Sequence, residues 1–122
     1  MPGIFFPSSS PRFADPGRTV AELKTLSSAL GERNALIERI CLFGSYAEGN
    51  ACARSDADVL VVLSRDRRPV RERLEEFLLA FADAPVPVDV LVCTRSELDE
   101  ARKEGNRFMN RAASGIDLYR RV

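Results

Sequence analysis

The sequence predicts a small α/β (α+β) domain in which one mixed sheet is flanked by helices. Short apolar runs rich in branched residues alternate with longer segments whose apolar residues recur at helical spacing. In addition, no internal repeat and no second zone of composition divides the chain. Its 122 residues match the usual size of one domain. We therefore expect a single domain at residues 18–122, preceded by an irregular N-terminal arm at residues 1–17.

The arm is predicted from its proline and serine content. Residues 1–17 have the sequence MPGIFFPSSSPRFADPG, which contains four prolines. Proline and serine at this density disfavour regular helices and strands. Ile4, Phe5 and Phe6 leave open an alternative in which the arm is anchored on the domain or on a neighbouring subunit, although a loose terminus is the preferred interpretation.

The first helix is expected to begin at Thr19. This threonine can cap a helix N-terminus, and Glu22 three residues later completes a capping box. Gly31 suits the end of the helix. Between them, apolar residues recur at helical spacing: Val20, Leu23, Leu26 and Leu30. Residues 36–43 (LIERICLF) then predict the first strand, and the small polar segment 44–55 predicts a turn with room for one short helical piece.

The second half of the chain supplies the remaining elements. Residues 59–63 (VLVVL) form a continuous apolar run, which is typical of a strand buried on both faces. A helix is expected at residues 69–82 because apolar residues repeat there at helical spacing, and Pro85 and Pro87 end it. The elements expected after it are a strand at 88–93, a helix capped by Ser96 and running to 102, a helix at 108–113, and a strand at 116–119.

The composition excludes several classes of function. Lys and Arg balance Asp and Glu at 18 each, so no overall field directs the chain to nucleic acid or to an anionic membrane. The arginine-rich stretch 65–73 is interleaved with acids, which indicates a solvated helix face. No apolar run reaches the roughly 18 residues of a membrane span, and no secretory leader is recognisable. The chain has no histidine, which excludes histidine bases and histidine metal ligands.

The cysteines indicate a reduced environment. Cys41, Cys52 and Cys93 are odd in number and form no CxxC pair. Cys41 and Cys93 fall within apolar runs, where a free cysteine usually packs as a small hydrophobic residue. We therefore expect a cytoplasmic protein without structural disulfides.

Three aspartates provide the strongest chemical signal. Asp56 and Asp58 are two residues apart at the start of an apolar strand, so their side chains point to the same face about 7 Å apart. Carboxylates this close repel each other unless a cation or a proton lies between them. Asp89 interrupts a later apolar run, and a buried carboxylate at that position would require a partner. If the two strands are neighbours, the three carboxylates can converge on Mg²⁺, which prefers such oxygen ligands.

The turn before these aspartates can hold phosphate. Gly44 allows the backbone to approach a phosphate closely, and Ser45 offers a hydroxyl and an amide proton to its oxygens. Two metal ions about 3.5–4 Å apart would stabilise the entering and leaving oxygens of an in-line displacement at phosphorus. The sequence therefore predicts phosphoryl or nucleotidyl transfer, in which positioning and charge neutralisation provide most of the catalysis.

The segment FGSYAEGNACARSDADVLVV resembles the signature of the DNA polymerase beta-like nucleotidyltransferase superfamily. More narrowly, it is similar to the minimal nucleotidyltransferases (MNT proteins), small bacterial and archaeal proteins with G-S-x-A-x-G ahead of S-D-x-D. The resemblance extends from about Val20 to the C-terminus, and Asp89 occupies the position of the third family carboxylate. The residues that match the motif are Gly44, Ser45, Ala47, Gly49, Ser55, Asp56 and Asp58.

The resemblance implies a fold, a chemistry and roles for the matching residues. The polymerase beta-like fold would place Asp56 and Asp58 as ligands of Mg²⁺, with two ions expected, and Asp89 as a third ligand or as the base that activates an acceptor hydroxyl. Gly44 and Ser45 would hold the phosphates of an NTP, with ATP the expected donor. Many relatives have an arginine where this chain has Glu48, and Arg54 is expected to supply that positive charge for nucleotide binding.

The resemblance also implies partners, and several functions stay open. Minimal nucleotidyltransferases commonly work with an all-helical HEPN protein, often as the antitoxin of a toxin–antitoxin pair, with a tyrosine of the partner as acceptor. An aminoglycoside-type small-molecule acceptor is a second enzymatic alternative. A non-catalytic module that neutralises or scaffolds a partner, and a nucleotide sensor without turnover, are alternatives of other classes. Neither the nucleobase nor the formation of a homo-oligomer follows from the sequence.

Overall fold

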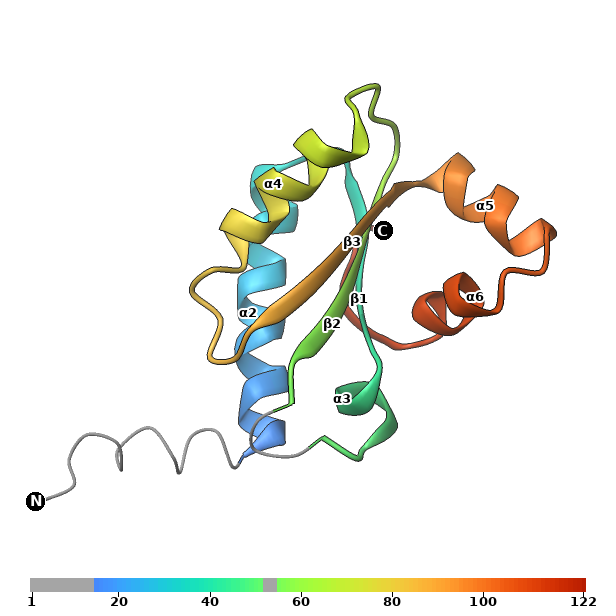
Figure 1. Ribbon diagram of the computed structural model, residues 1–122. Coiled ribbons are helices and arrows are strands. Elements are labelled where there is room, and N and C mark those ends of the chain that lie inside the picture. The colour runs from blue at the N-terminus through green and yellow to red at the C-terminus, as the bar shows by residue number, and fades with distance from the viewer. Residues whose placement is uncertain (1–14, 52–54) are drawn as a thin grey trace, which may run out of the picture.

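The computed structural model describes residues 15–51 and 55–122 and is built around a four-stranded mixed sheet (Figure 1). The strands lie in the order β3-β2-β1-β4, with β2 and β3 parallel and the other neighbours antiparallel. The predicted fold class, a small mixed sheet flanked by helices, is confirmed. The strands are β1 (Ile37–Phe43), β2 (Ala57–Leu63), β3 (Val88–Thr94) and β4 (Ile116–Arg120).

Helices cover both faces of the sheet. In Figure 1, α2 and α4 lie on one side and α5 and α6 on the other, while the short α3 follows β1 at one end of the sheet. The predicted helices at 69–82 and 108–113 are confirmed to within a few residues. The bounds are α2 (Pro16–Arg33), α3 (Ser45–Glu48), α4 (Val70–Ala80), α5 (Arg95–Lys103) and α6 (Arg107–Ala113).

The central strand β2 sends alternate side chains into two separate cores. Val59 and Val61 pack in the cluster that contains Leu23 of α2 and Phe77 of α4. Leu60 and Val62 pack in a second cluster with residues of α5 and α6. Every residue from Val59 to Leu63 is buried, which confirms the prediction of a strand covered on both faces. Because strand side chains alternate, Asp58 belongs to the face that α5 and α6 partly cover.

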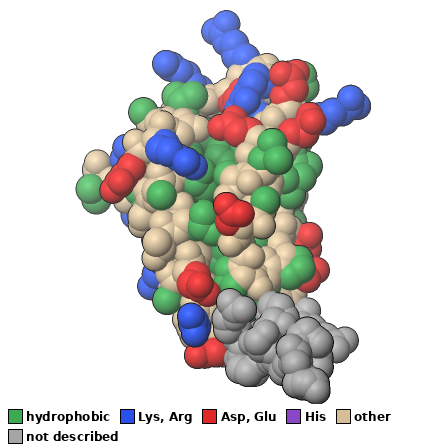
Figure 2. Space-filling model, turned by 90° about the vertical axis from the view of Figure 1, so that its left-hand side faces the viewer, with side chains coloured by type: hydrophobic (Ala, Val, Ile, Leu, Met, Phe, Trp, Pro, Cys, Tyr) green, Lys and Arg blue, Asp and Glu red, His purple; other side chains and the backbone are tan. Residues whose placement is uncertain are grey.

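The outer surface of α2 and α4 retains some apolar character. Figure 2 shows this side of the molecule, where hydrophobic side chains emerge between charged ones. Leu79 of α4 is 77% exposed and Leu78 is 44% exposed. No helix within residues 15–51 or 55–122 combines the length and the apolar character that crossing a bilayer requires.

The predicted start of the first helix is wrong. The helix begins at Pro16, and Asp15 is its cap, accepting a hydrogen bond from the Arg18 amide at 3.1 Å. Thr19 lies inside the first turn, where its hydroxyl donates to the Asp15 carbonyl. Aspartate caps a helix as well as threonine does, and proline suits the first helical position because no partner is needed for its missing N–H. Two of the residues assigned to the arm are thus helical, and residues 1–14 lie outside the described part of the chain.

Two further helix boundaries differ from the prediction. Gly31 does not end α2, which continues to Arg33; instead a side chain at Gly31 would collide with the ring of Tyr119. Ser96 does not cap α5. Thr94 does, with its hydroxyl accepting from the Glu97 amide while the Glu97 carboxylate accepts from the Thr94 amide. The cap therefore lies two residues earlier than predicted, and Thr94 forms a capping box with Glu97.

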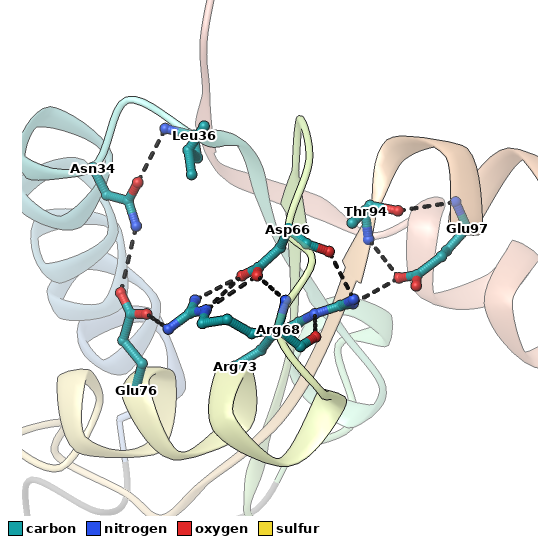
Figure 3. Close-up of polar contacts among 8 residues, drawn as sticks. All are labelled: Asn34, Leu36, Asp66, Arg68, Arg73, Glu76, Thr94 and Glu97. Carbon is teal, nitrogen blue, oxygen red and sulfur yellow. Dashed lines mark hydrogen bonds and ion pairs between the residues drawn. The ribbon is translucent and has the colours of Figure 1, made fainter.

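The arginine-rich stretch after β2 is not simply a solvated face. Arg73 of α4 is only 5% exposed, and Figure 3 shows it reaching toward the loop of Asp66 and toward Glu97. Its guanidinium donates to the carbonyls of Asp66 and Arg68 at 2.9 and 3.0 Å and pairs with the Glu97 carboxylate at 2.8 Å. Arg73 therefore joins α4 to the β2–α4 loop and to the start of α5.

Replacing Arg73 with Met is expected to lower the free energy of unfolding by about 3 kcal/mol, because two backbone carbonyls and one carboxylate lose their donor. Chemical denaturation with urea measures the change. Arg71→Met is the control, since Arg71 lies on the same helix but is exposed. Equal losses in both variants would contradict a structural role for Arg73.

Candidate active site

The structure brings Asp58 and Asp89 together. The two residues are direct partners in the register of the parallel strands β2 and β3. They share a face of the sheet with Leu60 and with Leu91, which belong to the α5–α6 side of the core. The two carboxylates therefore emerge side by side at the beginning of their strands.

Asp56 lies just before β2 and is exposed. The chain on both sides of it is fixed: the Tyr46 hydroxyl donates to the Ser55 carbonyl at 3.3 Å, and the Ala57 amide donates to the Pro87 carbonyl at 2.9 Å. Tyr46 is itself buried in the core. These contacts hold the backbone of Asp56 against α3 on one side and against the start of β3 on the other.

The three carboxylates influence one another electrostatically. Partial burial raises the pKa of Asp58, and the negative charges of Asp89 and Asp56 raise it further. A divalent cation would remove this repulsion, so the donor set suits a hard cation such as Mg²⁺. Among the described residues, however, no three acidic or sulfur-bearing side chains are close enough to form a closed ligand set. The aspartates are neighbours, with Asp58 as the central one.

The expectation that Asp89 is a buried carboxylate is wrong. β3 is an edge strand, and Asp89 is exposed while Val90 and Leu91 are only partly buried. An apolar run therefore does not show that both faces of a strand are covered, since β3 has such a run and yet lies at the edge of the sheet with only its last two residues buried. The reason to expect a cation near Asp89 is therefore its position beside the carboxylate of Asp58, and not the burial of its own side chain.

Gly44 places the turn against Asp58. Its φ of 76° and ψ of −149° are disfavoured for residues with a side chain, and a Cβ at this position would collide with Oδ2 of Asp58. Ser45 follows as the first residue of α3 and is partly buried. Glycine is therefore required both by the backbone conformation and by the approach of the carboxylate.

A family model described as "Nucleotidyltransferase domain" matches residues 23–112, a span that contains the Gly44 turn and all three aspartates. The chain belongs to the nucleotidyltransferase domain family. This confirms the resemblance to the minimal nucleotidyltransferases of the polymerase beta-like superfamily and makes the chain a transferase.

One solved structure agrees with this assignment at the level of fold. It is the crystal structure of a Sulfolobus solfataricus protein that is provisionally assigned as a nucleotidyltransferase. The match has a TM-score of 0.59 and 22% sequence identity, and it covers 80% of this chain and 85% of the other. A search of curated proteins found no match.

Some features of this nucleotidyltransferase were beyond the sequence prediction. Arg54, expected to bind nucleotide, lies outside the described residues. Conversely, no pattern in the sequence selected Phe108, an exposed residue of α6 whose ring meets that of Phe43 edge to face. Phe43 is the cross-strand partner of Asp58, so Phe108 contacts the residue that lies opposite Asp58 in the sheet. The only sequence signal was an aromatic residue at the start of a short helix, which is too common to single it out.

Proposed function

We propose that this nucleotidyltransferase moves a nucleoside monophosphate, AMP from ATP, onto an acceptor hydroxyl in a Mg²⁺-dependent reaction. The observation that supports the proposal is the register of Asp58 beside Asp89, with the glycine turn at Gly44 packed against Asp58. Carboxylates on adjacent strands next to a close-approach turn suit the binding of a metal–triphosphate complex.

Each residue has a proposed role. Asp56 and Asp58 hold the cation with help from Asp89, and Ser45 with the backbone at Gly44 contacts the phosphates. Bound Mg²⁺, expected as two ions, neutralises the charge that develops on the phosphate oxygens. The acceptor oxygen forms a bond to the α-phosphorus while the bond to the bridging oxygen of the β-phosphate breaks and pyrophosphate leaves. We propose Asp89, whose side chain is exposed, as the base that takes the proton of the acceptor hydroxyl.

The proposed acceptor is a tyrosine of an all-helical HEPN-type partner, with this chain acting as the MNT antitoxin in the cytoplasm. The resemblance to minimal nucleotidyltransferases supports this part of the proposal. Cys41 and Cys93 are both buried free thiols, which fits a reducing compartment.

The decisive experiment follows the label of [α-³²P]ATP. The protein is incubated with Mg²⁺ and a HEPN-type helical protein, and label on a partner tyrosine together with released pyrophosphate is expected. A partner with that tyrosine changed to Phe should accept no label. EDTA should prevent the transfer. If no ATP is consumed in the presence of Mg²⁺ and the partner, the chain does not transfer AMP to this partner.

The same assay separates the alternatives. Transfer to an aminoglycoside but not to protein would assign a small-molecule enzyme. ATP binding without turnover would indicate a nucleotide sensor. If an Asp58→Asn variant neutralises the partner as well as the unaltered protein does, the chain acts as a non-catalytic binding module.

A further inference from the structure

An exposed aromatic ring lies on the same face of the sheet as the acidic site. Phe108, in the first turn of α6, is 55% exposed. Its ring meets the ring of Phe43 with centroids 5.8 Å apart and planes at 87°. Phe43 is 7% exposed and packs in the α5–α6 core, so it holds the Phe108 ring in place while more than half of the Phe108 side chain stays exposed.

The position of Phe108 relative to Asp58 follows from the strand register. Phe43 is paired with Asp58 across β1 and β2, and both side chains are on the α5–α6 face. Side chains of such cross-strand partners lie about 5 Å apart. The Phe108 ring is therefore separated from Asp58 by a single intervening side chain, that of Phe43. A nucleotide whose phosphates are held at Asp58 can reach across one side chain with its base.

Single exposed apolar residues are common on protein surfaces and need no explanation by themselves. Leu79 and Val70 of α4 are exposed in this way, but they lie on the helix layer on the other side of the sheet. Phe108 differs because it is aromatic, is held by a second aromatic ring, and is linked through that ring to the strand position opposite Asp58. An aromatic face open to solvent is a surface on which a nucleobase can stack.

We propose that Phe108 is the stacking surface for the nucleobase of the donor nucleotide. The inference rests on the proposed function, since it assigns the base position of the same site. Stacking on a phenyl ring tolerates different bases because every base has a π-face. Phe108 therefore contributes affinity for nucleoside triphosphates in general, and discrimination between ATP and GTP depends on other residues.

The test compares binding of Mg–ATP with binding of inorganic tripolyphosphate, which has the phosphates but no base. Phe108→Ala is expected to weaken Mg–ATP binding and raise KM about tenfold with little change in kcat, because stacking stabilises substrate and transition state alike. Its affinity for tripolyphosphate should stay unchanged. Phe108→Tyr should retain the affinity for ATP, and Leu79→Ala, on the opposite helix layer, should behave like the unaltered protein.

The outcomes separate this inference from the proposed function. Turnover by the unaltered protein combined with an unchanged KM in Phe108→Ala would overturn the stacking site alone. Equal weakening of ATP and tripolyphosphate would also overturn it, because the substitution would then act on the phosphate region. Mg–ATP binding that depends on Phe108 without transfer of AMP to the acceptor would confirm the stacking site and contradict the proposed function.

Discussion

Asp58→Asn is expected to lower the rate of nucleotidyl transfer by about a thousandfold or more, because the central carboxylate of the site loses its charge while its shape is kept. Asp58 is the neighbour of both Asp89 and Asp56, so no other single substitution removes as much of the cation site. Steady-state transfer of labelled nucleotide measures the loss. Asp83→Asn, an exposed aspartate in the turn after α4, is the matched control and should retain full activity.

The same substitution should stabilise the metal-free protein. Burial, Asp89 and Asp56 raise the pKa of Asp58, so the folded state binds a proton at this residue more tightly than the unfolded state does. Its contribution to stability is fully present below the unfolded pKa and is lost as pH rises through the folded pKa. At neutral pH in EDTA, Asp58→Asn should therefore melt at a higher Tm than the unaltered protein, whereas Mg²⁺ should raise the Tm of the unaltered protein only. A lower Tm for the variant in EDTA would show that Asp58 is not under electrostatic strain.

Gly44→Ala is the second substitution with a large expected effect. The new methyl group meets Oδ2 of Asp58 and requires a backbone conformation that alanine rarely adopts. We expect a loss of about 1–3 kcal/mol in the free energy of unfolding and, because the carboxylate is displaced, a loss of transfer activity on the order of a hundredfold. Urea denaturation and labelled-ATP turnover measure the two effects.

Gly105→Ala is the matched control for backbone strain. Gly105 has the same φ of 76° as Gly44, but a methyl group added there would meet no atom within 4 Å. Gly105→Ala should lower the free energy of unfolding by the same amount as Gly44→Ala or less, and it should keep full transfer activity. If both variants keep full activity, the close approach of Gly44 to Asp58 has no part in catalysis.

Much of the fold followed from local patterns. The apolar run at residues 59–63 correctly indicated a strand segment buried on both faces, because none of these residues offers a polar side chain to solvent. The helical spacing of α4 was equally decisive, with Phe77 and Phe81 both buried where the pattern placed them. The parallel arrangement of β2 and β3 agrees with their order along the chain, since two strands joined through a helix tend to be parallel neighbours, but the register that pairs Asp58 with Asp89 comes from the structure.

The remaining features depend on contacts between distant parts of the chain. The exposure of Asp89 reflects the place of β3 at the sheet edge, which the apolar composition of that strand does not reveal. The burial of Arg73 depends on the carbonyls of another loop and on Glu97 of α5. Phe108 becomes notable only because α6 folds back onto Phe43. The roles of the aspartates and of Ser45 stay predictions until the substitutions are measured.

The order of the strands has a consequence for synthesis on the ribosome. β1 is made early, but one of its two neighbours, β4, is the last strand of the sheet to emerge. Until then, one side of β1 has no strand to pair with, and the carbonyls of Gly31 and Ile37 lack the guanidinium of Arg121 that binds them in the finished fold. Until β4 and Arg121 are made, a nascent chain is thus open to pairing with other polypeptides along one side of β1.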